Sequence, residues 1–141
     1  MLTITKIFRF EMAHALYGYN GACEHLHGHS YELHVSLKGL GVETYIKAPG
    51  LLMDFKELKQ LINSAIIEHL DHKLCLSEKY IQANNMVLKP DNLMLFPAEP
   101  SVENLLIYIR NELMECLPPY VQLQSLRLFE TRDSYAEWIN N

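Results

Sequence analysis

The sequence predicts an α+β fold, in which an antiparallel sheet carries two helices on one face. Two long stretches near the N-terminus, residues 4–14 and 27–38, alternate apolar and polar residues with the two-residue period of half-buried strands. Two later stretches, about 55–70 and 102–117, carry apolar residues at helical spacing. Strand-like patterns return near the C-terminus. The order strand, strand, helix, helix, strand, strand is typical of α+β proteins.

The first two strands place histidines on their apolar faces. One face of the first strand ends at His14 and, apart from Lys6, is apolar: Ile4, Phe8, Phe10 and Met12. The second strand alternates likewise, and His27 and His29 share the phase of its apolar face: Tyr31, Leu33, Val35 and Leu37. A turn rich in Gly and Asn separates the strands. An antiparallel pair would therefore bring His14 close to His27 and His29.

Both helices have clear start signals, and the last strand has an irregularity. Asp54 and Ser101 precede the two apolar helical patterns and are good N-caps. Pro118 and Pro119 end the second helix. In residues 120–130 the apolar phase switches near Ser125, which predicts a β-bulge. Residues 75–100 are broken by Asn and Pro, with 86–88 and 93–96 as candidate short strands.

The densest chemistry lies in residues 23–29, which read Cys-Glu-His-Leu-His-Gly-His. Two inward imidazoles at the end of a strand are costly unless they bind something, whereas neutral imidazole is a good ligand for Zn2+. A catalytic zinc site takes three protein ligands and keeps one open position. His14, His27 and His29 are the favoured set, and His25, which shares their phase, competes for the third place. The alternative is that these are ordinary polar loop histidines.

Length and composition indicate one globular domain spanning residues 1–141. The hydrophobic fraction is 49%, and 12 basic against 17 acidic residues give a net charge of −5, which argues against a nucleic-acid surface. Neither a signal-peptide layout nor a membrane-length apolar stretch is present in the sequence. Three cysteines, an odd number, predict free thiols in a reducing cytoplasm. Cys75 and Cys116 stand in apolar surroundings and are predicted packing residues.

Several motifs together resemble the 6-pyruvoyl-tetrahydropterin synthase / 6-carboxytetrahydropterin synthase family. They span most of the chain: His14, Cys23-x-x-x-His27-Gly28-His29, Met53-Asp54-Phe55, Leu70-Asp71-His72, Pro100-Ser101-x-Glu103-Asn104 and Glu130-Thr131. Relatives more often carry Thr where this chain has Ser101. The resemblance implies the tunnelling fold, in which subunits join their sheets into a barrel. It also implies a homo-hexamer, a dimer of trimers, with active sites at subunit contacts.

The resemblance further implies a small-molecule substrate, 7,8-dihydroneopterin triphosphate, and a role for each motif. Zn2+ on the three histidines would bind the side-chain hydroxyls of the substrate. Cys23 would act as a base, Asp71 and His72 would form a second proton-transfer unit, and Glu130 with Thr131 would hold the pterin ring. Read alone, Asp71 and His72 fit a solvated helix end, and the alternative role of Glu130 is a salt bridge to Arg127 or Arg132.

Two choices stay open at this point. The three residues between Cys23 and His27 resemble the bacterial branch of the family, which implies the 6-carboxytetrahydropterin product of queuosine synthesis and not the 6-pyruvoyl product of biopterin synthesis. Glu24 resembles a variant in which a glutamate serves where others use the cysteine, giving 6-hydroxymethyl-dihydropterin; its alternative role is an exposed loop carboxylate. A hypothesis of another class is a non-catalytic zinc-stabilised binding domain, in which Cys23 would close the site as a fourth ligand.

Overall fold

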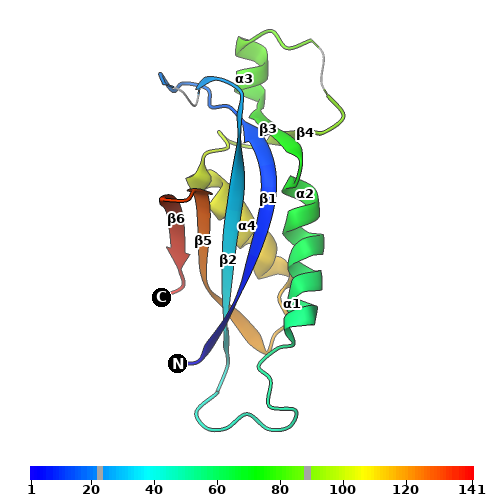
Figure 1. The fold of residues 1–141 in the computed structure, drawn as a ribbon, viewed down its shortest axis with the longest axis vertical. Helices are drawn as coiled ribbons and strands as arrows, with labels where there is room; N and C mark the ends of the chain where they lie inside the picture. Colours follow the sequence, from blue (N-terminus) through cyan, green and yellow to red (C-terminus); the bar gives the residue numbers. More distant parts are fainter. Residues whose placement is uncertain (22–23, 88–89) are drawn as a thin grey trace.

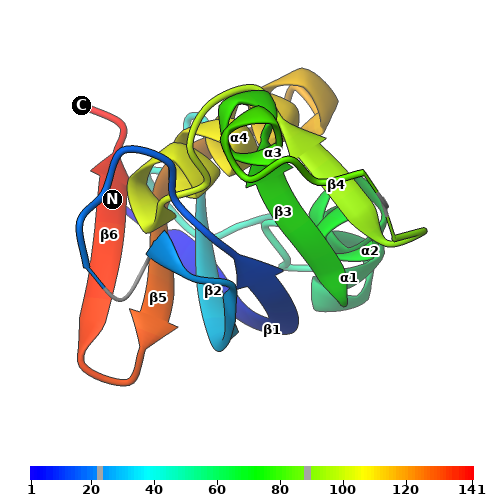
Figure 2. The same cartoon turned by 90° about the horizontal axis from the view of Figure 1, so that it is seen from above.

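A computed structural model describes residues 1–21, 24–87 and 90–141. A long, curled sheet forms one layer, and helices form a second layer behind it (Figure 1, Figure 2). The strands are β1 (Thr3–His14), β2 (His27–Gly39), β3 (Lys73–Ser77), β4 (Leu93–Phe96), β5 (Val121–Thr131) and β6 (Ser134–Ile139). The predicted α+β class is confirmed, and so are both N-terminal strands and the last two.

The six strands are ordered β4-β3-β1-β2-β5-β6. β1, β2, β5 and β6 pair antiparallel, as the sequence predicts. β3 and β4 extend this sheet in parallel, β3 beside the end of β1 and β4 beside β3. The sheet is therefore mixed, not wholly antiparallel. The sequence pattern predicts no strand at 73–77, because these residues resemble the end of a helix followed by an irregular segment.

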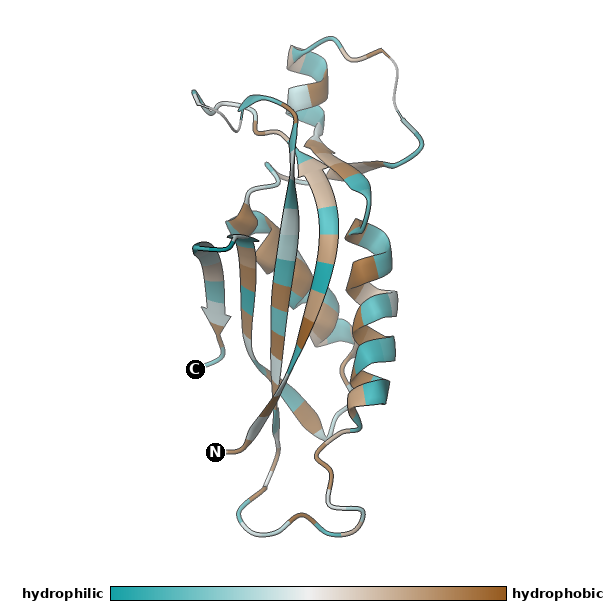
Figure 3. Ribbon diagram, viewed as in Figure 1, coloured by the Kyte–Doolittle hydropathy of each residue, from teal (hydrophilic) through white to brown (hydrophobic). Residues whose placement is uncertain are grey.

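The register of β1 and β2 sets the position of the histidines. His14 lies opposite His27, and Met12 lies opposite His29. Apolar and polar bands alternate along both strands (Figure 3). The apolar face packs against the helices, and its largest buried side chains include Phe10, Tyr31 and Leu33. The histidines thus continue the core-facing side of the sheet at its end.

The predicted helix at 55–70 is one continuous helical segment with a π-helical turn inside it. It comprises α1 (Phe55–Ile62), η2 (Asn63–Ile67) and α2 (Glu68–Leu70). Its start is capped by Asp54, whose Oδ1 accepts the Lys56 N–H at 2.8 Å. α4 (Val102–Cys116) is the second predicted helix, and Ser101 Oγ accepts the Asn104 N–H at 3.2 Å. Both helices lie on the same face of the sheet (Figure 2).

A small unit between the two helices extends the sheet. β3 leads into the short helix α3 (Glu78–Ala83), and the chain returns through β4. Residues 93–96 are a strand as predicted. The strand suggested at 86–88 is wrong: Met86 and Val87 have no regular structure, and Val87 is 90% exposed, so it has no sheet to pack on. Leu88 lies outside the described residues.

The predicted bulge in β5 is confirmed. Ser36 pairs with Ser125 but its neighbour Leu37 pairs with Leu123, so Gln124 is the extra residue. The bulge changes which β5 residues face the core, and Leu126 and Leu128 are fully buried after it. Glu130 follows in the same phase and so points toward the helix-covered side of the sheet. None of the helices in the described part of the chain is long and apolar enough to cross a membrane.

Candidate metal centre

Three imidazoles meet at the end of the β1–β2 pair. A ligand nitrogen from each of His14, His27 and His29 lies within 4.8 Å of the other two. The rings of His14 and His29 approach edge to face, with centroids 5.1 Å apart, and those of His27 and His29 lie 4.8 Å apart. Strand register explains the cluster, since His14 faces His27 across the pair and His29 is two residues further on the same face.

Backbone carbonyls orient two of the three rings. His14 Nδ1 lies 2.6 Å from Pro100 O, and His27 Nδ1 lies 2.7 Å from the carbonyl oxygen of His25. A carbonyl only accepts, so each Nδ1 is the donor and each Nε2 keeps its lone pair. The two Nε2 atoms nevertheless face each other at 2.9 Å. Two lone pairs at that distance repel, and a cation shared between them removes the repulsion.

The cluster favours neutral imidazoles, the form that binds metal. Burial lowers the pKa of His14 to about 4, and that ring is only 1% exposed. Burial also lowers the pKa of His29. Its Nε2 atom is buried and makes no hydrogen bond within the described part of the chain. Three converging imidazole nitrogens, two of them on rings whose pKa burial lowers, fit an ion such as Zn2+ that accepts imidazole and leaves a position open.

The other candidates near this cluster are placed differently. His25 contributes its carbonyl to His27, while its own side chain is exposed and is not part of the cluster. Glu24 is exposed, and it lines a separate cleft of about 410 Å3 beside α3. Cys23, the predicted base, lies outside the described residues. Of the other thiols, Cys75 is buried, with a pKa raised to about 12 by burial, whereas Cys116 is exposed and not the packing residue predicted.

Glu130 borders the cluster. Its Oε1 lies 3.4 Å from His29 Nε2, and both side chains are largely buried. The expected competitor for this carboxylate is engaged elsewhere, because Arg127 Nε donates to Glu137 Oε1 at 2.6 Å. Thr131 turns away: it is exposed, and its Oγ1 accepts the Asp133 N–H at 3.4 Å in the β5–β6 turn. The structure thus brings Glu130, and not Thr131, to the histidines.

Asp71 and His72 lie at the edge of β1 that faces β3, whereas His27 and His29 belong to β2 at the opposite edge. Asp71 Oδ1 accepts the Glu11 N–H at 2.9 Å and lies 3.0 Å from His72 Nδ1. The Glu11 N–H, followed by His72, lowers the pKa of the Asp71 carboxyl. The His72 side chain is 79% exposed, and its backbone is left-handed at φ 61°, which is uncommon for a residue other than Gly. Within the described chain, no hydrogen bond or ion pair joins this pair to the three histidines.

Sequence reasoning missed the residues that hold the cluster from outside. Pro100 supplies the carbonyl for His14, and Tyr31 places its hydroxyl 3.4 Å from the same Nδ1. A proline carbonyl 86 positions away leaves no pattern in the sequence. The only available signal is that the ring nitrogen of a buried His14 needs an acceptor.

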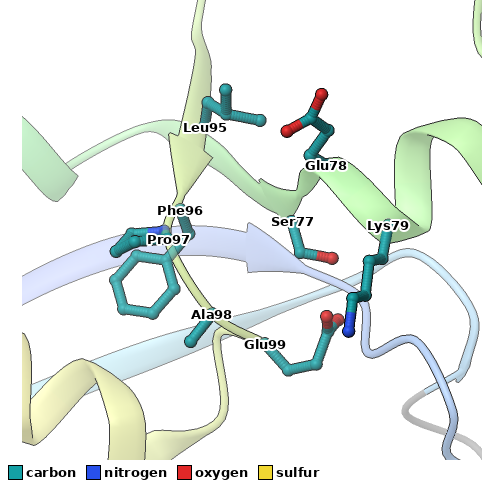
Figure 4. Close-up of a pocket in the computed structure, with 8 residues that line it drawn as sticks. All are labelled: Ser77, Glu78, Lys79, Leu95, Phe96, Pro97, Ala98 and Glu99. Carbon is teal, nitrogen blue, oxygen red and sulfur yellow. The ribbon is translucent and has the colours of Figure 1, made fainter.

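A cleft of about 650 Å3 opens beside this region, at the carboxyl ends of β3 and β4. Figure 4 shows Ser77, Glu78 and Lys79 on one wall and Pro97, Ala98 and Glu99 on the other. Glu99 immediately precedes Pro100, so the cleft and the histidine cluster share one segment of chain. Its lining includes none of the three histidines.

Comparison with known proteins assigns a family to this architecture. The family model described as 6-pyruvoyl tetrahydropterin synthase matches residues 3–140. Among curated proteins, the chain is similar to a 6-carboxy-5,6,7,8-tetrahydropterin synthase of Haemophilus influenzae, with 30% identity over 98% of this chain and 99% of that one. It is also similar to a 6-pyruvoyl tetrahydrobiopterin synthase of Dictyostelium discoideum, with 30% identity over 82% of this chain and 72% of that one.

Solved structures agree on the fold. The 6-pyruvoyl tetrahydropterin synthase of Caenorhabditis elegans superposes with a TM-score of 0.73 at 20% identity, covering 99% of this chain and 96% of that one. The Plasmodium vivax protein of the same name gives 0.69 at 19% identity, covering 100% and 99%. A further P. vivax structure of this protein is described as a mutant of a catalytic glutamate.

Proposed function

Because the chain belongs to the 6-pyruvoyl tetrahydropterin synthase family, we propose that it is a zinc-dependent 6-carboxy-5,6,7,8-tetrahydropterin synthase. Its substrate is 7,8-dihydroneopterin triphosphate, its by-products are acetaldehyde and triphosphate, and its product enters queuosine and deazapurine synthesis. The observation that carries the proposal is the convergence of His14, His27 and His29, with carbonyl-oriented rings, in a chain whose full-length relatives bear this name.

The three histidines would hold the metal through their ring nitrogens, and burial favours the neutral, metal-binding form of His14 and His29. Zn2+, when bound there, supplies a Lewis acid for the hydroxyls of the substrate side chain. The carbonyls of Pro100 and His25 fix the ring orientations, as the outer partners of metal-binding histidines generally do. Glu130, at the border of the cluster, would accept hydrogen bonds from the amidine-like edge of the pterin and position its side chain toward the histidines.

Proton transfer is assigned to three residues. Cys23, two positions before His25 in the loop, would remove a carbon-bound proton as a thiolate. Asp71 stays ionised, since the Glu11 N–H lowers its pKa, and its carboxylate orients the His72 ring. A carboxylate that holds an imidazole beside solvent is suited to move protons near neutral pH. Thr131 keeps the turn after Glu130 in place.

Assembly follows from the same family. We place the chain in a homo-hexamer of one such domain per chain, with sites between subunits and a pterin as the bound small molecule. The open sheet supports this, because β6 and β4 stand at its two edges and a barrel closes only if copies join. The exposed Asp71–His72 pair supports sites completed between chains. The odd number of cysteines favours a reducing compartment, the cytoplasm.

The 6-pyruvoyl product and the Glu24-dependent cleavage are the alternatives. The first is favoured by the Dictyostelium relative, and the second by the P. vivax structure described as a catalytic glutamate mutant, since Glu24 stands beside Cys23 here. Product analysis separates the three. We expect 7,8-dihydroneopterin triphosphate to give 6-carboxytetrahydropterin and acetaldehyde by mass spectrometry; either other pterin as the main product contradicts the proposal.

Two variants identify the base. Cys23→Ala is expected to keep zinc while turnover falls by roughly 10²–10⁴, the usual contribution of a general base, and Glu24→Gln is expected to be mild. The reverse pattern assigns the reaction to Glu24. A non-catalytic zinc domain predicts instead that Cys23 is a fourth ligand. Spectroscopy of the cobalt-substituted protein would then show a thiolate-to-metal band that disappears in Cys23→Ala.

A further inference from the structure

The loop between β1 and β2 is tied down at its start by a residue that the motifs do not include. Glu99 Oε1 accepts the backbone N–H of Tyr17 at 2.7 Å. Tyr17 comes three residues after the candidate ligand His14, at the point where the chain leaves the sheet. The two partners are 82 positions apart in the sequence, so the bond joins the loop to the segment that precedes α4.

The residue after Glu99 holds the metal candidate itself. Pro100 O receives the Nδ1 proton of His14 at 2.6 Å, so adjacent residues contact the histidine and the loop that follows it. One peptide segment therefore fixes both the end of β1 and the first turn after it. Any shift of this segment would move the ring and the loop together.

This segment is itself firmly anchored. The carbonyl oxygen of Glu99 accepts the Ser101 N–H at 2.8 Å and the Asn104 Nδ2–H at 2.9 Å. Ser101 at the same time caps α4. The backbone of Glu99 is thus hydrogen-bonded to the N-terminus of a helix that packs on the sheet. This fixes the position of the Glu99 backbone, and with it the carboxylate that binds the loop.

We propose that Glu99 is a positioning residue of the active site, a role that rests on the proposed function. Its carboxylate sets the course of the β1–β2 loop, whose far end carries Glu24, His25 and then the candidate ligand His27. The carbonyl of His25 orients the His27 ring. The loop is therefore joined to the cluster at His14, just before it begins, and at His27, just after it ends. Glu99 acts through this backbone and touches neither metal nor substrate.

The cleft in Figure 4 offers a matched control. Glu78 and Glu99 both line it, on different elements of the fold. Glu78 Oε1 accepts from Gln82 Nε2 of its own helix at 3.3 Å, and among the described residues it has no hydrogen bond to the loop. Replacing Glu78 therefore removes a carboxylate from the same cleft without releasing Tyr17. Glu99→Gln is the conservative variant, because its amide oxygen still accepts the Tyr17 N–H.

The experiment measures amide hydrogen exchange at Tyr17 together with steady-state kinetics, in the zinc-loaded protein. Glu99→Ala is expected to lose protection at Tyr17 while the β2 amides stay protected, to keep its zinc, and to lose 10–100-fold in kcat with little change in KM. Glu99→Gln is expected to restore most of both effects. Glu78→Ala is expected to match the wild type in exchange and kinetics.

Unchanged protection at Tyr17 in Glu99→Ala overturns the proposal, and so does unchanged kcat. Equal impairment in Glu99→Gln overturns it too, because the charge and not the loop bond would then matter. Faster exchange throughout β2 in Glu99→Ala shows a general structural role instead. If the wild-type protein forms no pterin product, the proposed function fails; the exchange at Tyr17 still decides whether Glu99 holds the loop.

Discussion

The histidine cluster and the Asp71–His72 pair flank the same strand but differ in burial and in contacts. The three histidines contact one another, are largely buried, and draw their outer partners from the same chain. The pair is ordered by the backbone of Glu11, but the His72 ring is 79% exposed and has no contact with the cluster within the described chain. The three histidines are thus preorganised by their own chain, whereas the Asp71–His72 pair presents an exposed ring.

The largest effect that separates the two regions is metal loss. His27→Ala is expected to remove most of the zinc, because two remaining imidazoles hold the ion poorly, and with it all measurable turnover. His25→Ala, a change two residues away, should keep its zinc because that side chain is exposed and outside the cluster. Metal analysis of both variants by mass spectrometry is the test. Full zinc in His27→Ala would mean that the site lies elsewhere.

Asp71→Asn is expected to leave zinc in place and to lower kcat by roughly 10²–10⁴. The neutral amide lacks the negative charge with which the carboxylate would stabilise a protonated His72 ring. The fold should persist, because Asn Oδ1 still accepts the Glu11 N–H. Zinc content and kcat are measured on the same preparation. Loss of metal in this variant would show that the two regions are one unit within a chain.

Mixing the two inactive chains tests where the site is completed. When His27→Ala and Asp71→Asn proteins are unfolded together and refolded as mixed oligomers, a fraction of the wild-type activity should return, because some sites then join an intact cluster to an intact pair. Refolding each variant alone is the control. If activity stays absent in mixed oligomers whose composition is verified by native mass spectrometry, cluster and pair belong to the same chain.

The smallest expected effect is a pH dependence of stability in the metal-free protein. The folded pKa of His14 is about 4 against 6.5 unfolded, so below pH 6.5 the unfolded chain binds a proton that the folded chain does not. Stability is therefore complete above pH 6.5 and falls by about 3 kcal/mol as the pH drops toward 4. His29 acts in the same direction.

Urea unfolding of the chelated protein at several pH values measures this slope, and His14→Gln should flatten it. An unchanged slope in that variant would show that His14 is not the buried neutral group responsible.

Local patterns predicted most of the fold because they record which side of an element is buried. The phases of His14, His27 and His29 placed them on one face, and the phase switch at Ser125 located the bulge that turns Glu130 inward. The parallel strand β3 was missed because it is only five residues long and lies directly after a helix. Its pairing beside β1 is decided by tertiary contact, which short segments do not encode.

The candidate site also contains residues that the sequence predicts and residues that it does not. Residue types and spacing identified candidates that the strands carry, but Glu99 and Pro100 act through single backbone-level bonds across more than 80 positions. Such bonds need only an acceptor in the right place, so no residue pattern announces them. Nor does the sequence show whether Asp71 and His72 work with residues of their own chain or of a neighbour.

The π-helical turn at 63–67 keeps the helix and the following residues in phase. Leu58, Ile62, Ile66 and Leu70 are all fully buried at a constant spacing of four, whereas a regular α-helix would drift by about 40° at each such step. The wider turn absorbs that drift. Deletion of one residue within the turn would therefore leave a regular α-helix with Asp71 and His72 still in place, whereas deletion of one residue from α1 with the turn retained would rotate both by about 100°. Natural variants of this helix should for that reason tolerate loss of a residue in the turn far better than loss of a residue from α1.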